Sequence, residues 1–212
     1  MEILNIILVI VLVANLFALG TSRIHSVIHI VAAQGALLGV IPLLLHEQLT
    51  VSMILAAGAA VALKGIAIPA IMIRSLRSAE IKREVEPLIG LLPSVILGAL
   101  ATALVLLITK RLPLAGHADT LIVPASISTV IAGFILLTTR FKALSQVLGY
   151  LVMENGIFIF GMLLVEALPL VVEMGVLLDL FVGIFVISII TNHINSAFSS
   201  MDTRKLVSLK EE

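Results

Sequence analysis

Three ionisable residues lie inside stretches that are otherwise apolar. Lys64 is flanked by alanine, glycine and aliphatic residues, and Glu154 and Asp179 each lie near the middle of an apolar run. A charge at membrane depth costs several kcal/mol, so it usually pairs with a partner or lies on an ion path. These residue types therefore indicate proton or cation movement, with Lys64 within reach of at least one acid.

Each of these residues also has a structural interpretation. Glu154 or Asp179 could be a neutral carboxyl group hydrogen-bonded to a neighbouring helix, since burial disfavours the charged form. A carboxyl group within reach of a cation is equally what a proton relay needs. Lys64 could form a static ion pair with either acid, or alternately hold and release it. The sequence leaves these alternatives open.

Further ionisable residues lie nearer to the predicted membrane surfaces. Glu166 and Glu173 flank Pro169 and are candidates for an entry or exit point. His193, at the end of the last apolar stretch, could pass protons or only favour a helix C-terminus. His25 and His29 are one helical turn apart, but no third ligand lies nearby, so a metal site is not predicted.

The composition determines which elements must position these residues. Of 212 residues, 60% are hydrophobic and 12% are charged, about half the charge of a soluble domain. The apolar runs recur at about 20 residues, the length that crosses a bilayer as a helix. We therefore predict an all-α, polytopic transmembrane bundle. Its seven expected spans are 3–20, 24–45, 49–73, 88–109, 120–139, 143–166 and 170–194.

The depth of each ionisable residue follows from the helical rise. Lys64 lies ten residues before Arg74, or about 15 Å along a helix, and Glu154 lies about 18 Å beyond Lys142. Asp179 lies about 15 Å beyond Pro169, which marks the opposite surface of the membrane. All three are predicted near the midplane, with Lys64 and Glu154 at nearly equal depth.

The basic residues predict an orientation. In a seven-span chain, the connections after spans one, three, five and seven share one side. That side holds ten basic residues and the other side two, Lys110 and Arg111. The ten are Arg23, Arg74, Arg77, Lys82, Arg83, Arg140, Lys142, Arg204, Lys205 and Lys210. Because basic residues concentrate on the cytoplasmic side, the N-terminus is predicted outside and the C-terminus in the cytoplasm.

Composition also excludes several classes of function. The formal net charge is zero, so a nucleic-acid partner has no support. The chain has no cysteine, which excludes disulfides and thiolate-ligated clusters within it.

The last three predicted spans resemble the K-type subunit of respiratory complex I and the C subunit of multisubunit cation/proton antiporters. In that family the final helix has an acid followed four residues later by glycine, as Asp179 and Gly183 do here. The preceding helix has a glycine, an acid and an asparagine. Gly149 and Asn155 match this pattern, while Glu154 lies one turn beyond the expected acid position, which is Leu151.

Nearly the whole chain resembles the E membrane subunit of hydrogenase-4 and related group 4 membrane-bound [NiFe] hydrogenases. The matching features are four additional N-terminal spans, Arg23 followed by the Gln34-Gly35 pair, the Glu154-Asn155-Gly156 run, the stretch from Glu173 to Gly183 and the Asn192-His193-Ile194 tail. The resemblance implies three regions: a four-helix membrane region at 1–119, a K-like three-helix region at 120–198 and a cytoplasmic tail at 199–212.

The same resemblance implies a subunit that is not an enzyme by itself and sits, multi-pass, in the plasma membrane of a prokaryote. Nickel–iron and iron–sulfur centres are expected in partner subunits, with no cofactor in this chain. The expected partners are large antiporter-like subunits, other small membrane subunits and cytoplasmic hydrogenase subunits. Two alternatives remain open: a subunit of a stand-alone cation/proton antiporter, and a structural wedge that joins the redox arm to the antiporter-like subunits.

Overall fold

The computed structural model describes residues 2–45, 50–78, 87–111 and 120–163. These residues are helical and contain no β-strand. The helices are α1 (Glu2–Gly20), α2 (Ile24–Leu45), α3 (Val51–Ala62), η1 (Leu63–Ala67), α4 (Ile68–Ser78), α5 (Leu91–Thr109), α6 (Ile122–Thr139) and α7 (Ala143–Gly161).

Six helices are long and apolar enough to cross a membrane within this part of the chain. They coincide with the first six predicted spans, the third being formed by α3, η1 and α4 in succession. The all-helical, membrane-spanning character of the protein is therefore confirmed for the described residues. The seventh predicted span, at 170–194, lies outside them.

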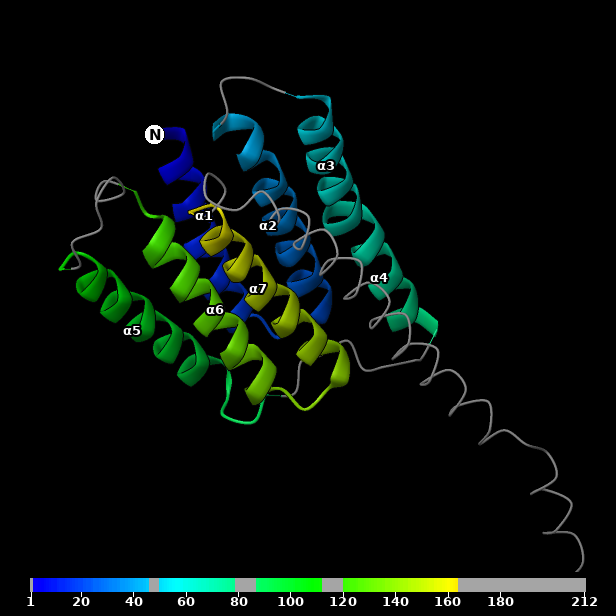
Figure 1. Ribbon diagram of the computed structural model, residues 1–212. Coiled ribbons are helices and arrows are strands. Elements are labelled where there is room, and N and C mark those ends of the chain that lie inside the picture. The colour runs from blue at the N-terminus through cyan, green and yellow to red at the C-terminus, as the bar shows by residue number, and fades with distance from the viewer. Residues whose placement is uncertain (1, 46–49, 79–86, 112–119, 164–212) are drawn as a thin grey trace, which may run out of the picture.

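The six spans alternate in direction and form one bundle (Figure 1). The start of α1, the end of α2, the start of α3, the end of α5 and the start of α6 lie at one end of it. Helix α1 packs against α2, α5 and α6, while α2 packs against α3, η1, α4 and α7. Contacts therefore run across the predicted boundary at residue 119, from the four N-terminal spans to α6 and α7.

Helices α6 and α7 make the most extensive contact between any two elements described. Three glycines bring their backbones together. A Cβ added to Gly149 would lie 2.5 Å from the Leu137 nitrogen, and one added to Gly156 would lie 2.6 Å from the Val130 nitrogen. Gly133 faces the Met153 backbone in the same way. Small residues allow such close approach in lipid, where helices associate by packing rather than by the hydrophobic effect.

The third span contains a π-helical turn, η1, at its centre. The backbone N–H of Ile68 donates to the carbonyl of Leu63, five residues earlier. Pro69 follows directly, and a proline ring inside an α-helix clashes with the carbonyl four residues before it. Widening the preceding turn relieves that clash, and π-turns of this kind often mark functional positions. Lys64 lies in this turn.

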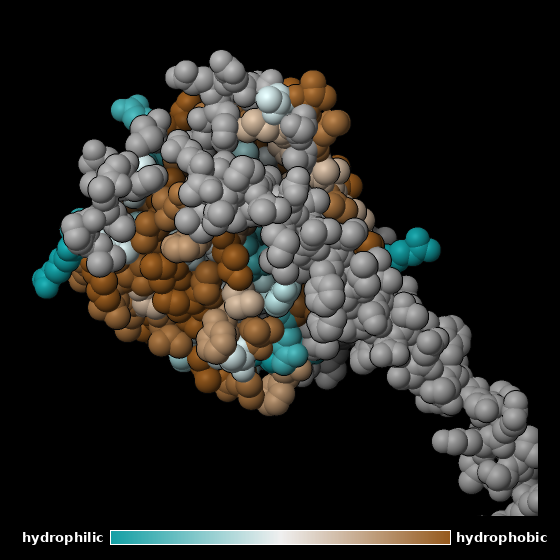
Figure 2. All heavy atoms as spheres, in the orientation of Figure 1, coloured by the Kyte–Doolittle hydropathy of each residue, from teal (hydrophilic) through white to brown (hydrophobic). Residues whose placement is uncertain are grey.

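The outer surface of the described bundle is apolar, whereas many of its polar side chains lie inside. Brown, hydrophobic spheres dominate the visible face of the described helices (Figure 2). On α5, large aliphatic residues are more than 45% exposed: Leu92, Ile96, Leu97, Leu100, Leu104, Leu107 and Ile108. Asn15, Gln34, Lys64, Glu154 and Asn155 are buried. Apolar residues outside and polar residues within are the arrangement expected of a bundle that faces lipid.

Candidate functional site: a buried ion pair and an amide chain

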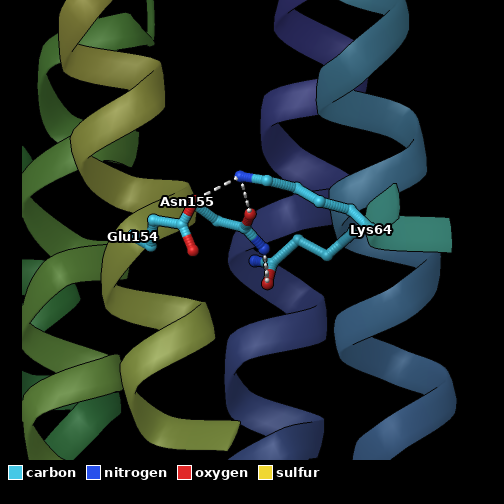
Figure 3. Close-up of polar contacts among 4 residues, drawn as sticks. Lys64, Glu154 and Asn155 are labelled. Carbon is cyan, nitrogen blue, oxygen red and sulfur yellow. Dashed lines mark hydrogen bonds and ion pairs between the residues drawn. The ribbon is translucent and has the colours of Figure 1, made fainter. Parts of the chain in front are cut away.

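A buried ion pair joins the third and sixth spans. The Lys64 Nζ lies 3.0 Å from the Glu154 Oε1, and the two side chains are only 8% and 4% exposed. Figure 3 shows the lysine side chain extending from its helix across to α7. This contact confirms the prediction that Lys64 and Glu154 lie at nearly equal depth, and it identifies Glu154 as an acid that Lys64 contacts.

Local packing directs Lys64 toward α7. The stem of the lysine passes directly over Gly35 of α2, where an added Cβ would lie 2.8 Å from the Lys64 Cβ. Any larger residue at position 35 would therefore displace the lysine. The Lys64 Nζ also lies 5.4 Å from the centre of the Phe158 ring, one turn beyond Glu154 on α7. An aromatic face at that distance attracts a cation.

Asn155 continues the polar contacts from the ion pair into the centre of the bundle. The Lys64 Nζ donates to the Asn155 Oδ1 at 3.3 Å, and the Asn155 Nδ2 donates to the Gln34 Oε1 at 3.3 Å (Figure 3). Gln34 then donates to the Asn15 Oδ1 at 2.9 Å, and Asn15 donates to the Thr129 Oγ1 at 2.8 Å. We call Asn155, Gln34 and Asn15 the amide chain.

The ion pair and the amide chain together connect five spans. Glu154 and Asn155 come from α7, Lys64 from η1, Gln34 from α2, Asn15 from α1 and Thr129 from α6. All six side chains are at least 90% buried. Buried polar groups in an apolar medium are tolerated when their hydrogen bonds are made. The satisfied network therefore specifies how these helices pack.

A small pocket adjoins the ion pair. It has a volume of about 10 Å³ and is lined by Val31, Gly35, Lys64, Ile68, Leu151 and Asn155. That is the space one water molecule needs when polar groups line it. Lys64 and Asn155 are the polar side chains in this lining.

A second buried cation lies at the end of the bundle near Lys142. Arg140 is 1% exposed, and its guanidinium donates to the Leu19 carbonyl at 2.9 Å and to the Ser94 Oγ at 3.3 Å. Burial lowers the pKa of Arg140 from its ordinary value. The carbonyl it contacts is near the C-terminus of α1, where helix dipoles favour a cation. Arg140 thus ties together the ends of α1, α5 and α6.

The remaining predicted site residues have different outcomes. Asp179, Glu166, Glu173 and His193 lie outside the described residues. His25 and His29 stack with ring centres 6.4 Å apart, and the His29 Nδ1 lies 2.7 Å from the His25 carbonyl. Within the described ranges, no cluster of three or more histidines, cysteines or acids could hold a metal ion.

Sequence reasoning missed several residues of the site. The sequence points to Asn155 only through the two family resemblances, and it does not point to Asn15. Both are amides inside apolar spans, which was the available signal. The sequence places Arg140 among the basic residues that set the orientation, whereas its side chain is buried between helix ends.

Lys64 and Glu154 are placed within proton-exchange distance of each other. A carboxyl group and an amine 3.0 Å apart are within the distance at which a proton passes directly between them. The side-chain amides can donate and accept hydrogen bonds, but they neither gain nor lose a proton at physiological pH. The two groups that can exchange a proton are therefore Lys64 and Glu154, and the amide chain is their support.

Comparisons with known proteins find a relative that matches over nearly the whole chain. No family model and no solved structure matches the chain. The chain is 30% identical over 201 residues to the uncharacterized protein Rv0085 of Mycobacterium tuberculosis. The alignment covers 93% of this chain and 91% of that protein, so the likeness extends over essentially the whole membrane bundle. The chain belongs to the same family as Rv0085.

Proposed function

We propose that this protein is a non-catalytic membrane subunit that contributes a mid-membrane ion pair to a proton or cation path. The side chains that take part in this path are those of Lys64 and Glu154, and Asp179 is the acid expected in the next span. Glu166, Glu173 and His193 are the proposed surface ends of the path. In this proposal the chain holds no cofactor, and redox chemistry takes place on other subunits.

The Lys64–Glu154 contact is the observation that supports the proposal. Two charged groups that are more than 90% buried have lost most of their hydration, which costs several kcal/mol per ion before their attraction is counted. Ionisable groups kept inside membrane spans usually lie on substrate, ion or proton paths. A cation that contacts an acid can change the acid's affinity for a proton by moving toward or away from it.

The wider assembly rests on the resemblance to the E subunit of hydrogenase-4. We propose that the chain sits in the plasma membrane of a prokaryote beside large antiporter-like subunits and other small membrane subunits. Cytoplasmic subunits would carry the nickel–iron and iron–sulfur centres. Purification of the native complex and identification of its subunits by mass spectrometry tests this assignment. A nickel-site subunit supports it, while antiporter subunits alone favour the stand-alone antiporter.

Glu154→Gln tests the role of the ion pair. The amide keeps the shape of the side chain and an oxygen that can accept from Lys64, but it cannot take up a proton. Proton uptake by vesicles carrying the assembled complex should fall about a hundredfold or more, as expected when a positioned proton-transfer group is lost. Asp179→Asn is the companion variant for the seventh predicted span.

The control is Glu2→Gln, which makes the same change at an exposed acid. It should leave proton uptake and assembly unchanged. Normal proton uptake by a correctly assembled Glu154→Gln complex would overturn the transport role.

A structural wedge is the second candidate, and one observation favours it. The ion pair is continuous with hydrogen bonds that join five spans, which is what a static support would also require. In that case Glu154→Gln reduces the stability of the bundle or its assembly but leaves the proton uptake of each assembled complex unchanged. Normalising proton uptake to the amount of assembled complex separates the two candidates.

A further inference from the structure

The hydrogen bonds of the amide chain all run in one direction. Lys64 donates to Asn155, Asn155 to Gln34, Gln34 to Asn15, and Asn15 to Thr129. At each step the amide carbonyl oxygen faces the lysine side of the chain, and the amide nitrogen faces Thr129. The side-chain dipoles are therefore aligned, with their negative ends toward Lys64.

Lys64 is the member of the chain that dictates this direction. An ammonium group carries donors and no acceptor, so the side chain of Asn155 must present its oxygen to it. The Asn155 nitrogen then faces Gln34, and the same requirement passes on to Asn15. Thr129 imposes no direction because a hydroxyl group both donates and accepts. The uniform direction is what a protonated Lys64 imposes.

We infer that Asn155, Gln34 and Asn15 are positioning residues that hold Lys64 as an ammonium and thereby keep Glu154 ionised. In an apolar bundle a proton can return from the lysine to the acid 3.0 Å away, which would leave two neutral groups. Aligned dipoles stabilise the charged lysine more strongly here than in water, because the surroundings screen them poorly. The amide chain itself carries no proton.

The inference deepens the proposed function and rests on it for any consequence in transport. The charge state of the pair, however, can be measured whether or not the protein translocates ions.

Gln34→Leu is the decisive variant, because Gln34 makes both central hydrogen bonds of the amide chain. Infrared spectroscopy of the full-length protein, purified with its native partners, distinguishes a protonated carboxyl group from a carboxylate. In the wild type Glu154 should absorb as a carboxylate. In Gln34→Leu its protonated fraction should rise about tenfold or more, the effect expected when hydrogen-bond support to a charged group is lost. Adding Glu154→Gln to this variant should abolish the new band and so assign it.

Gln146→Leu is the matched control. Gln146 donates to the Arg140 carbonyl on the end of the bundle and takes no part in the amide chain, so its loss should leave the Glu154 carboxylate band unchanged. A Glu154 that stays fully ionised in folded Gln34→Leu would overturn the inference. A wild-type Glu154 that is already protonated would overturn it as well.

Thr129→Val decides the question if Gln34→Leu yields no folded protein. Valine has nearly the shape of threonine but cannot accept from Asn15 at the far end of the chain. A rise in protonated Glu154 would support the inference, and an unchanged carboxylate would overturn it. If Glu154→Gln complexes still pump while Gln34→Leu shows the new band, the transport proposal fails and the positioning role stands.

Discussion

Lys64 illustrates how one buried residue depends on several others. Its ammonium contacts a carboxylate, an amide oxygen and an aromatic ring, each from α7, while its stem lies on Gly35 of α2. Removing one partner of a buried ion pair costs about 3–5 kcal/mol, since the other charge is left uncompensated. A residue of this kind therefore constrains its neighbours as much as they constrain it.

Arg140 gives a prediction at the same scale. Arg140→Lys keeps the positive charge, but a single ammonium on a different stem cannot reproduce the planar contact with both the Leu19 carbonyl and the Ser94 hydroxyl. Loss of a hydrogen bond that involves a charged group should lower the free energy of unfolding by about 1.5–3 kcal/mol. Thermal unfolding in detergent, followed by circular dichroism, measures the change.

Arg111→Lys is the control for this prediction because Arg111 is exposed. It should change stability by less than about 0.5 kcal/mol, as surface substitutions usually do. Equal stability of the Arg140→Lys and wild-type proteins would show that the two contacts of Arg140 contribute nothing beyond charge.

The packing of α6 on α7 depends on glycine at the points of closest approach. Gly149→Ala places a methyl group 2.5 Å from the Leu137 backbone nitrogen, a distance that only separation of the helices can relieve. Overpacking of this kind should destabilise the bundle by about 1–3 kcal/mol. Because Glu154 and Asn155 lie on the same helix, the variant should also weaken the ion pair. Unfolding in detergent measures the first effect, and the Glu154 infrared band the second.

Gly58→Ala is the matched control for Gly149→Ala. A Cβ added at Gly58 of α3 meets nothing within 4 Å, and alanine favours a helix over glycine by about 1 kcal/mol in water. This variant should therefore be as stable as the wild type or more so. Equal effects of the two substitutions would mean that the α6–α7 contact is looser than the structure indicates.

At the scale of the whole molecule, the alternating spans place basic residues unequally at the two ends of the bundle. Arg23, Arg74 and Lys142 lie at the end that holds the α1–α2 and α6–α7 connections, whereas Lys110 and Arg111 lie at the other. The positive-inside rule then predicts that Arg111 faces the outside of the cell. Since the chain has no cysteine, single cysteines are clean reporters.

Arg111→Cys should react with a membrane-impermeant thiol reagent in intact cells, and Arg23→Cys should react only after permeabilisation. Both native residues are exposed, so the comparison reflects the side of the membrane and not burial. The reverse labelling pattern would place the N-terminus in the cytoplasm and reject the predicted orientation.

The sequence by itself determined the helical class, the first six apolar spans and the nearly equal level of Lys64 and Glu154 along the bundle. It did so because a membrane span needs about 20 apolar residues, and because the rise of a helix converts residue number into depth. The equal depth of Lys64 and Glu154 followed from that arithmetic alone. The hydrogenase assignment, the orientation and the role of Asp179 stay predictions.

The tertiary structure alone decided which residues meet. Depth places two residues in one plane of the membrane. Which acid Lys64 contacts depends on how each helix is rotated and on which helices are neighbours. The π-turn before Pro69 sets the rotation of Lys64, and Gly35 allows its stem to cross α2 toward Glu154. Asn15 and Gln34 are joined by packing of α1 on α2, which no spacing within one helix encodes. The burial of Arg140 also depends on tertiary packing, because the ends of three helices surround its side chain.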